Sequence, residues 1–110
     1  FVLNYCPLLF LGESSANLSP DKLPAGACEA LYRACDNHLR EVVEALAPAW
    51  VVGVGGFAEA RAREVVGKDR VKVTRVLHPS PASPAANRGW AAAAALELES
   101  AGIWPSLSGR

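Results

Sequence analysis

The 110-residue chain lacks the features that mark several classes of protein. It contains no hydrophobic run near the roughly 18 residues that a membrane span requires. Its three cysteines cannot all pair with one another, which disfavours a secreted disulfide scaffold. Hydrophobic residues make up 51% of the chain and charged residues 20%, so it also lacks the composition of a disordered segment. These absences leave one folded domain of ordinary composition as the expectation.

The N-terminus has neither an initiating methionine nor the basic segment and cleavage site of a signal peptide. The chain opens on Phe1, directly inside the apolar run FVLNYCPLLFL. This start favours an interpretation in which residues 1–110 are the C-terminal part of a single domain whose N-terminal part is missing.

The chain has no net charge, which disfavours a protein that binds nucleic acid over much of its surface. Its charges are nevertheless unevenly distributed along the sequence. Residues 1–50 carry six acidic and three basic side chains, whereas residues 51–110 carry five acidic and eight basic ones. A solvated helix face with an adjoining strand edge explains such a cluster, and so does a patch that faces phosphates. The clustered bases are Arg61, Arg63, Lys68, Arg70, Lys72 and Arg75.

Hydrophobic periodicity predicts a long amphipathic helix from Ala25 to Leu46, begun by Pro24 and stopped by Pro48. Its apolar positions are spaced by three or four residues, as one face of a helix requires. They are Cys28, Leu31, Cys35, Leu39, Val42 and Leu46.

The remaining segments predict strands alternating with helices. We expect buried strands at Phe1–Leu11 (ending near Asn4, because Pro7 cannot sit in a central ladder), at Trp50–Val54 and at Val71–Leu77. Residues 12–20 have the composition of a loop. Helices are expected at Phe57–Val66 and at Trp90–Ser100, the latter closed by Gly102.

This alternation predicts an α/β fold, a parallel sheet with helices on both faces and right-handed crossovers. Ligands of such sheets bind outside the carboxyl ends of the strands. Three segments would lie there: Asn4–Pro7, Gly53–Phe57 and His78–Gly89.

Two sequence motifs of known binding sites, a dinucleotide fingerprint and a zinc site, are present only in part. Gly53-Val54-Gly55-Gly56 has Ala58 where a dinucleotide fingerprint needs its third glycine, so a tight strand-to-helix turn is the favoured interpretation. Cys28, Cys35 and His38 match no compact zinc spacing. We therefore expect the two thiols in a core and His38 on an exposed helix face.

His78 is the strongest candidate for chemistry, because it ends a β-branched strand and opens a loop with three prolines. Prolines restrict the backbone, so this loop loses little entropy on binding a partner. Asn4 is the second candidate, since a carboxamide both donates and accepts hydrogen bonds and suits a base edge. For each residue a purely structural role remains open.

The segments NYCPLLF (Asn4–Phe10), VVGVG (Val51–Gly55) and HPSPASPAANRGW (His78–Trp90) occur in this order along the chain. Together with NLSPDKLPA (Asn17–Ala25) and AEARAREVV (Ala58–Val66), they resemble the single-strand-selective monofunctional branch of the uracil-DNA glycosylase superfamily. The resemblance covers nearly the whole chain.

The resemblance implies a three-layer α/β/α sandwich around a parallel sheet, and hydrolysis of the N-glycosidic bond of uracil and oxidised uracils in DNA. It implies a nuclear base-excision repair enzyme with no metal or organic cofactor and no membrane partner. A flipped nucleotide would enter the pocket. His78 would match the catalytic histidine and Asn4 the residue that binds the uracil edge. The DNA-binding loop would comprise Pro79, Ser80, Pro81, Ala82, Ser83, Asn87, Arg88 and Gly89.

Two departures from the family pattern bear on activity. Ala82 stands where other members carry an arginine that fills the gap left by the flipped base, and Ser83 replaces an asparagine. The G-M-N-P-G segment, with its water-positioning asparagine, is not in these 110 residues. We therefore expect the chain alone to hold an incomplete active site. A catalytically silent single-strand-binding fragment and an unrelated doubly wound domain that binds a small ligand at Gly53–Gly56 remain alternatives.

Overall fold

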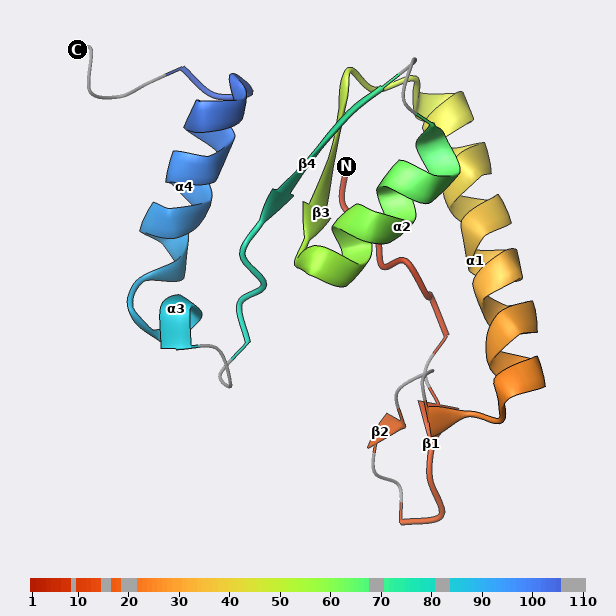
Figure 1. Cartoon of the computed structure of the whole chain (residues 1–110). Helices are drawn as coiled ribbons and strands as arrows, with labels where there is room; N and C mark the ends of the chain where they lie inside the picture. The colour runs from red at the N-terminus through yellow and green to blue at the C-terminus, as the bar shows by residue number, and fades with distance from the viewer. Residues whose placement is uncertain (9, 15–16, 19–21, 68–70, 81–83, 106–110) are drawn as a thin grey trace. The chain divides into compact units, whose positions relative to one another are not determined.

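The computed structural model describes residues 1–8, 10–14, 17–18, 22–67, 71–80 and 84–105. The chain divides into two compact units, Phe1–Leu46 and Ala47–Arg110, and each is described by itself (Figure 1). Within the described residues, no helix has both the length and the apolar character to cross a bilayer.

The long helix of the first unit confirms the periodicity argument. Helix α1 runs from Ala25 to Leu46, between the two prolines that were expected to bound it. Its first turn is closed by the Pro24 carbonyl, which accepts a hydrogen bond from the Cys28 amide at 2.9 Å. Cys35 and Leu39, one turn apart on the predicted apolar face, are the buried residues of the helix.

The predicted N-terminal strand is wrong. Residues 1–8 form no strand, and the side chains of Phe1 and Val2 are 93% and 94% exposed. Instead, a two-residue strand β1 (Phe10–Leu11), at the end of the segment predicted as strand, pairs antiparallel with β2 (Asn17–Leu18), which lies inside the segment predicted as loop. An apolar run alone does not make a strand, because the backbone also needs a neighbouring strand that satisfies its hydrogen bonds.

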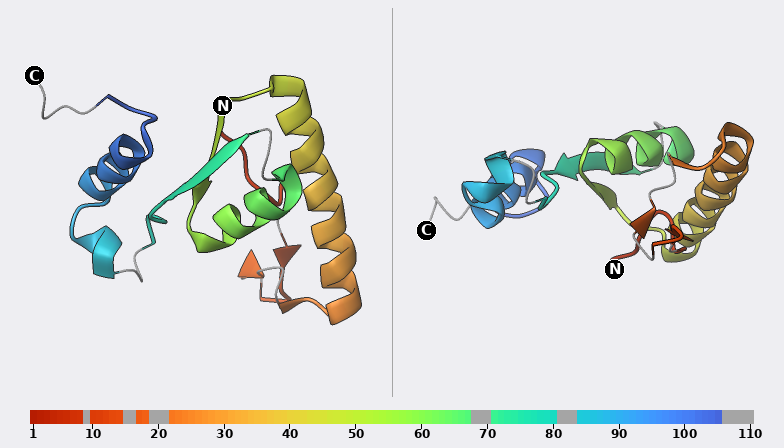
Figure 2. Two further views of the ribbon diagram at one scale, coloured as in Figure 1. Left: turned by 45° about the horizontal axis from the view of Figure 1, so that its top comes forward. Right: turned by 90° about the horizontal axis from the view of Figure 1, so that it is seen from below.

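The second unit contains the predicted parallel pair. Strand β3 (Trp50–Val54) pairs in parallel with β4 (Lys72–Val76), from Trp50 opposite Lys72 to Val54 opposite Val76. Helix α2 (Gly56–Val66) makes the crossover and packs against both strands (Figure 2). This arrangement is an α/β fold with a two-stranded parallel sheet among the described residues.

Close packing between α2 and the sheet accounts for Gly53 in the middle of β3. A β-carbon at Gly53 would lie 2.5 Å from the backbone nitrogen of Glu59 on α2, closer than real atoms approach. Ala62 and Val65 of α2 and Val76 of β4 are buried residues of these packed elements. The glycine therefore sets how near the helix lies to the strand.

The C-terminal part of the unit forms two helices, α3 (Pro84–Asn87) and α4 (Trp90–Ala101). Helix α4 packs against β4 and buries Ala94. Gly102 ends it in the left-handed conformation, with φ of 82°, as the sequence predicts. Helix α3 lies within the segment expected to be loop, and it begins at Pro84, a residue that suits a first helical turn.

Candidate functional site

The carboxyl ends of β3 and β4 bring together two of the segments selected from the sequence. The Gly55 amide donates a hydrogen bond to the carbonyl of Val76 at 2.9 Å. Gly55 has φ of 92°, and a β-carbon there would lie 3.2 Å from the β-carbon of His78. The glycine therefore serves both the strand-to-helix turn and the close approach of His78. The predicted tight turn is confirmed.

The backbone immediately before His78 is held on both sides by α4. The Leu77 amide donates a hydrogen bond to Oε2 of Glu97 at 2.8 Å. The Leu77 carbonyl accepts a hydrogen bond from the indole nitrogen of Trp90. With both polar groups of Leu77 occupied, the peptide that carries His78 has little freedom to rotate.

His78 itself is exposed at this strand end. Its carbonyl accepts a hydrogen bond from the Ser80 amide at 2.8 Å, which closes a three-residue turn around Pro79. The chain thus changes direction directly after the histidine and leaves the imidazole at the surface. An exposed imidazole on a fixed backbone is suited to donate a hydrogen bond to a ligand outside the sheet.

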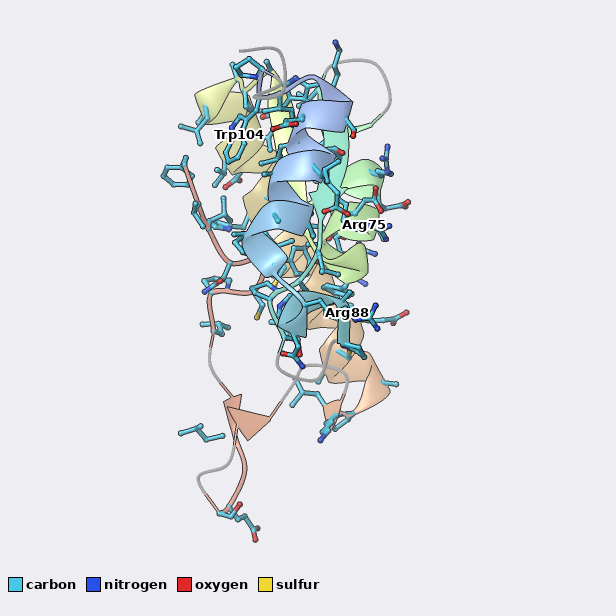
Figure 3. The ribbon with its side chains drawn as sticks, turned by 90° about the vertical axis from the view of Figure 1, so that its left-hand side faces the viewer. Arg75, Arg88 and Trp104 are labelled. Atoms are coloured by element: carbon cyan, nitrogen blue, oxygen red, sulfur yellow. The ribbon has the colours of Figure 1, made fainter. Side chains whose placement is uncertain are left out.

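Only part of the predicted DNA-binding loop is described. Pro81, Ala82 and Ser83 lie outside the described residues. Asn87 ends α3, and Gly89 has φ of 124° before α4 begins. Arg88 is exposed between them. Figure 3 shows Arg88 below Arg75, toward the carboxyl end of β4.

Asn4 lies in the first unit and is exposed. The next residue, Tyr5, is fixed to α1 because its hydroxyl donates a hydrogen bond to Oδ1 of Asp36 and also lies 3.1 Å from the Tyr32 carbonyl. The two units are described separately, so a shared pocket of Asn4 and His78 stays a prediction.

Side chains in the predicted basic cluster are partly paired within the second unit. Glu59 of α2 accepts from Arg63 at 3.0 Å and lies 3.7 Å from the guanidinium of Arg75. The ammonium of Lys72 lies over the Trp50 ring, 5.3 Å from its centre. Lys68 and Arg70 lie outside the described residues. These contacts favour the interpretation as a solvated surface at Arg63 and Arg75. Arg88, outside this cluster, is an exposed cation of the predicted DNA-binding loop.

The cysteines follow the expectation of core thiols only in part. Cys35 is 3% exposed, whereas Cys28 is half-buried and His38 is exposed. Burial, a hydrogen bond with Cys6 and the nearby negative charges raise the pKa of Cys35 to about 11. Among the described residues, no three His, Cys, Asp or Glu side chains are placed to hold a metal ion.

Sequence reasoning did not find Glu97 and Trp90 as supports of the site. The available signal was a carboxylate inside an otherwise apolar helix (WAAAAALELES). A half-buried acid in such a setting needs a donor, and the strand-end amide of Leu77 supplies one.

The second unit is therefore an α/β unit that presents an exposed histidine at the carboxyl end of a parallel strand, where ligands of such sheets bind. The chain is 47% identical over 98% of its length to a protein of rat named single-strand selective monofunctional uracil-DNA glycosylase. It is 47% identical to the mouse protein and 46% identical to the bovine protein of that name, again over 98% of its length. The chain is therefore homologous to part of the single-strand-selective monofunctional uracil-DNA glycosylases, and the predicted resemblance is confirmed.

The chain spans about 40% of the length of these curated relatives. No protein-family model matches the chain.

Proposed function

We propose that this chain supplies the histidine-bearing part of a uracil-DNA glycosylase, which hydrolyses the N-glycosidic bond of uracil in DNA and leaves an abasic site. The observation that carries the proposal is the placement of His78. It stands against Gly55 at the ends of two parallel strands, on a backbone held by Glu97 and Trp90. The homology supplies the reaction, since the relatives are named for it.

His78 would act on the leaving base. As the glycosidic bond breaks, the bonding electrons move to the uracil ring and negative charge grows on its oxygen. A neutral imidazole that donates a hydrogen bond to this oxygen stabilises the charge, and it does so more in the transition state than in the ground state. A fixed backbone matters here because a donor already in place needs no reorganisation during the reaction.

Asn4 would select the base, because its carboxamide pairs with a carbonyl and the ring N–H of uracil and disfavours cytosine. DNA would be held by the loop after β4. Its described members are Pro79, Ser80, Asn87, Arg88 and Gly89, and Arg88 would meet a phosphate. Pro81, Ala82 and Ser83 complete this predicted surface.

We extend the proposal to uracil and oxidised uracils in single- and double-stranded DNA, without a metal or organic cofactor, and to action in the nucleus. Ala82 bears on the strand preference, because it is too small to fill the gap left by a flipped base in a duplex. Single-stranded DNA leaves no such gap. We therefore expect single-stranded substrate to be cleaved faster than duplex.

The test combines two proteins. One is the 110-residue chain itself, and the other is the rat glycosylase with its matching portion replaced by this chain. Each is incubated with a single-stranded oligonucleotide that carries one uracil. We expect no release by the chain alone and measurable release by the chimera. A folded chimera without activity would contradict the proposal.

A silent single-strand-binding fragment is the second candidate, and the exposed Arg88 in the loop favours it. Such a fragment would bind uracil-containing and uracil-free strands equally, with an affinity that falls steeply as salt rises. Several-fold tighter binding to the uracil-containing strand would instead favour the glycosylase.

A further inference from the structure

The first unit brings two of the three cysteines together. The Tyr5 hydroxyl donates a hydrogen bond to the Asp36 carboxylate and lies 3.1 Å from the Tyr32 carbonyl, so residue 5 lies over one turn of α1. The Tyr5 and Tyr32 rings also meet, with their centres 6.1 Å apart. Cys6 follows Tyr5 directly, and Cys35 lies in that same helical turn. The hydrogen bond of Tyr5 to α1 therefore holds Cys6 near Cys35.

The two thiols are neighbours but differ in their surroundings. Cys6 is close enough to Cys35 for its side chain and charge to raise the pKa of the Cys35 thiol, and the Cys6 thiol lies 3.7 Å from the Leu8 carbonyl. Cys35 is 3% exposed, whereas Cys6 is only half-buried. Both are free thiols. Cys6 is thus the sulfur that a reagent in solution reaches first.

We propose that Cys6 and Cys35 form a thiol–disulfide exchange site that reacts with small disulfides of the glutathione disulfide class. The Cys6 thiolate attacks one sulfur of the reagent, forming a mixed disulfide and expelling one reduced thiolate. Cys35 loses its proton to solvent and attacks Cys6 Sγ, expelling the second reduced thiol. Two protein thiols are oxidised to one disulfide, and one small disulfide is reduced to two thiols.

The surroundings of Cys35 disfavour ionisation of its thiol. Burial, the hydrogen bond with Cys6 and the Cys6 charge raise the pKa of the Cys35 thiol, which keeps it protonated while Cys6 is reduced. A mixed disulfide at Cys6 removes the contributions of Cys6 to this rise, whereas burial, the largest cause, remains. Cys35 reacts second because the reagent reaches only the more accessible sulfur, Cys6, from solution.

Cys28 serves as an internal control. It precedes Cys35 by seven residues on α1, which separates the two by about 10 Å along the helix axis. Two cysteines whose α-carbons lie more than about 7 Å apart cannot be bridged without moving the backbone. The folded unit therefore admits Cys6–Cys35 and excludes Cys28–Cys35.

Oxidation has one consequence for the site. Asn4 lies two residues before Cys6, so a Cys6–Cys35 disulfide would fasten the segment that carries the proposed uracil-binding amide to α1. That consequence rests on the proposed function, whereas the disulfide itself does not.

The experiment maps disulfides in the 110-residue chain after equilibration with reduced and oxidised glutathione. Trypsin cleaves after Lys22, Arg33 and Arg40, which places Cys6, Cys28 and Cys35 on three separate peptides (residues 1–22, 23–33 and 34–40). We expect the peptides 1–22 and 34–40 to be linked in the wild-type chain and in Cys28→Ser, and unlinked in Cys6→Ser. Mass spectrometry of blocked digests measures each pairing without any activity assay.

The same reaction in denaturant gives the opposite preference. In an unfolded chain the seven-residue loop of Cys28–Cys35 closes about eight times more readily than the 29-residue loop of Cys6–Cys35. Folding should therefore invert the ratio of the two products. Equal ratios with and without denaturant, disulfides only between chains, or no protein disulfide at any glutathione ratio would overturn the proposal.

Discussion

The hydrogen bond between Leu77 and Glu97 offers a direct test of how the site is supported. Glu97→Ala removes the carboxylate that accepts from the Leu77 amide at 2.8 Å and leaves that half-buried amide without its acceptor. Glu97→Gln keeps the shape and one acceptor oxygen but loses the charge. We expect the alanine variant to loosen the backbone before His78 and the glutamine variant to have an intermediate effect.

The magnitude follows from the chemistry of the pair. A half-buried donor deprived of its partner costs about 1–3 kcal/mol, and a bond to a charged acceptor lies toward the upper part of that range. Where local opening governs exchange, this cost accelerates hydrogen exchange of the Leu77 amide by about five- to 150-fold. The glutamine variant should recover about half of the lost free energy.

Amide hydrogen exchange measured by NMR reads this effect at the Leu77 position. Glu99→Ala is the matched control, since it removes the same charge about 200° around α4. We expect Leu77 protection to fall in Glu97→Ala and to stay unchanged in Glu99→Ala. Equal protection of Leu77 in the wild type and in Glu97→Ala would refute the argument that α4 fixes the histidine loop.

Three further predictions concern stability. Gly53→Ala should lower the free energy of unfolding by about 1–3 kcal/mol, because its β-carbon would meet the backbone of α2. Gly26→Ala, with open space around it, should be neutral or stabilising, and urea unfolding of the two variants compares them. Burial and its neighbours raise the pKa of the Cys35 thiol from 9.0 to about 11. The protonated thiol should therefore contribute fully to the free energy of unfolding below about pH 9, and this contribution should be lost as the pH rises toward 11. Cys35→Ala lacks this loss, so the difference between the pH-dependent unfolding of the wild type and of this variant measures it. Tyr5→Phe should cost about 1 kcal/mol by removing the donor to Asp36, and a urea midpoint equal to that of the wild type would contradict the anchoring of Tyr5.

Helices and the central strand pair could be predicted because their signals are local. The three-and-four spacing from Cys28 to Leu46, bounded by Pro24 and Pro48, predicts α1 within its observed limits. The continuous apolar run of β3 and the alternation in β4 likewise predict a parallel pair joined by a helix. In each case propensity, periodicity and capping residues agree.

The N-terminal strand could not be judged from such signals. Phe1 to Leu11 is as apolar as a buried strand, yet Phe1 and Val2 are exposed, and Tyr5 binds α1 through its hydroxyl. Strand formation depends on a partner distant in the sequence, which no local pattern names. The supports of His78 were missed for the same reason, since Glu97 lies twenty residues beyond the amide that it binds.

The most direct test of the account compares two histidine variants of the chimera that carries this chain in the rat glycosylase. His78→Ala should cut the rate of uracil release from single-stranded DNA at least roughly tenfold, because the leaving base loses its hydrogen-bond donor. His38→Ala, which alters an exposed residue of α1, should leave the rate unchanged. Equal rates for the His78→Ala chimera and the unmodified chimera would contradict the assignment of His78 to the reaction.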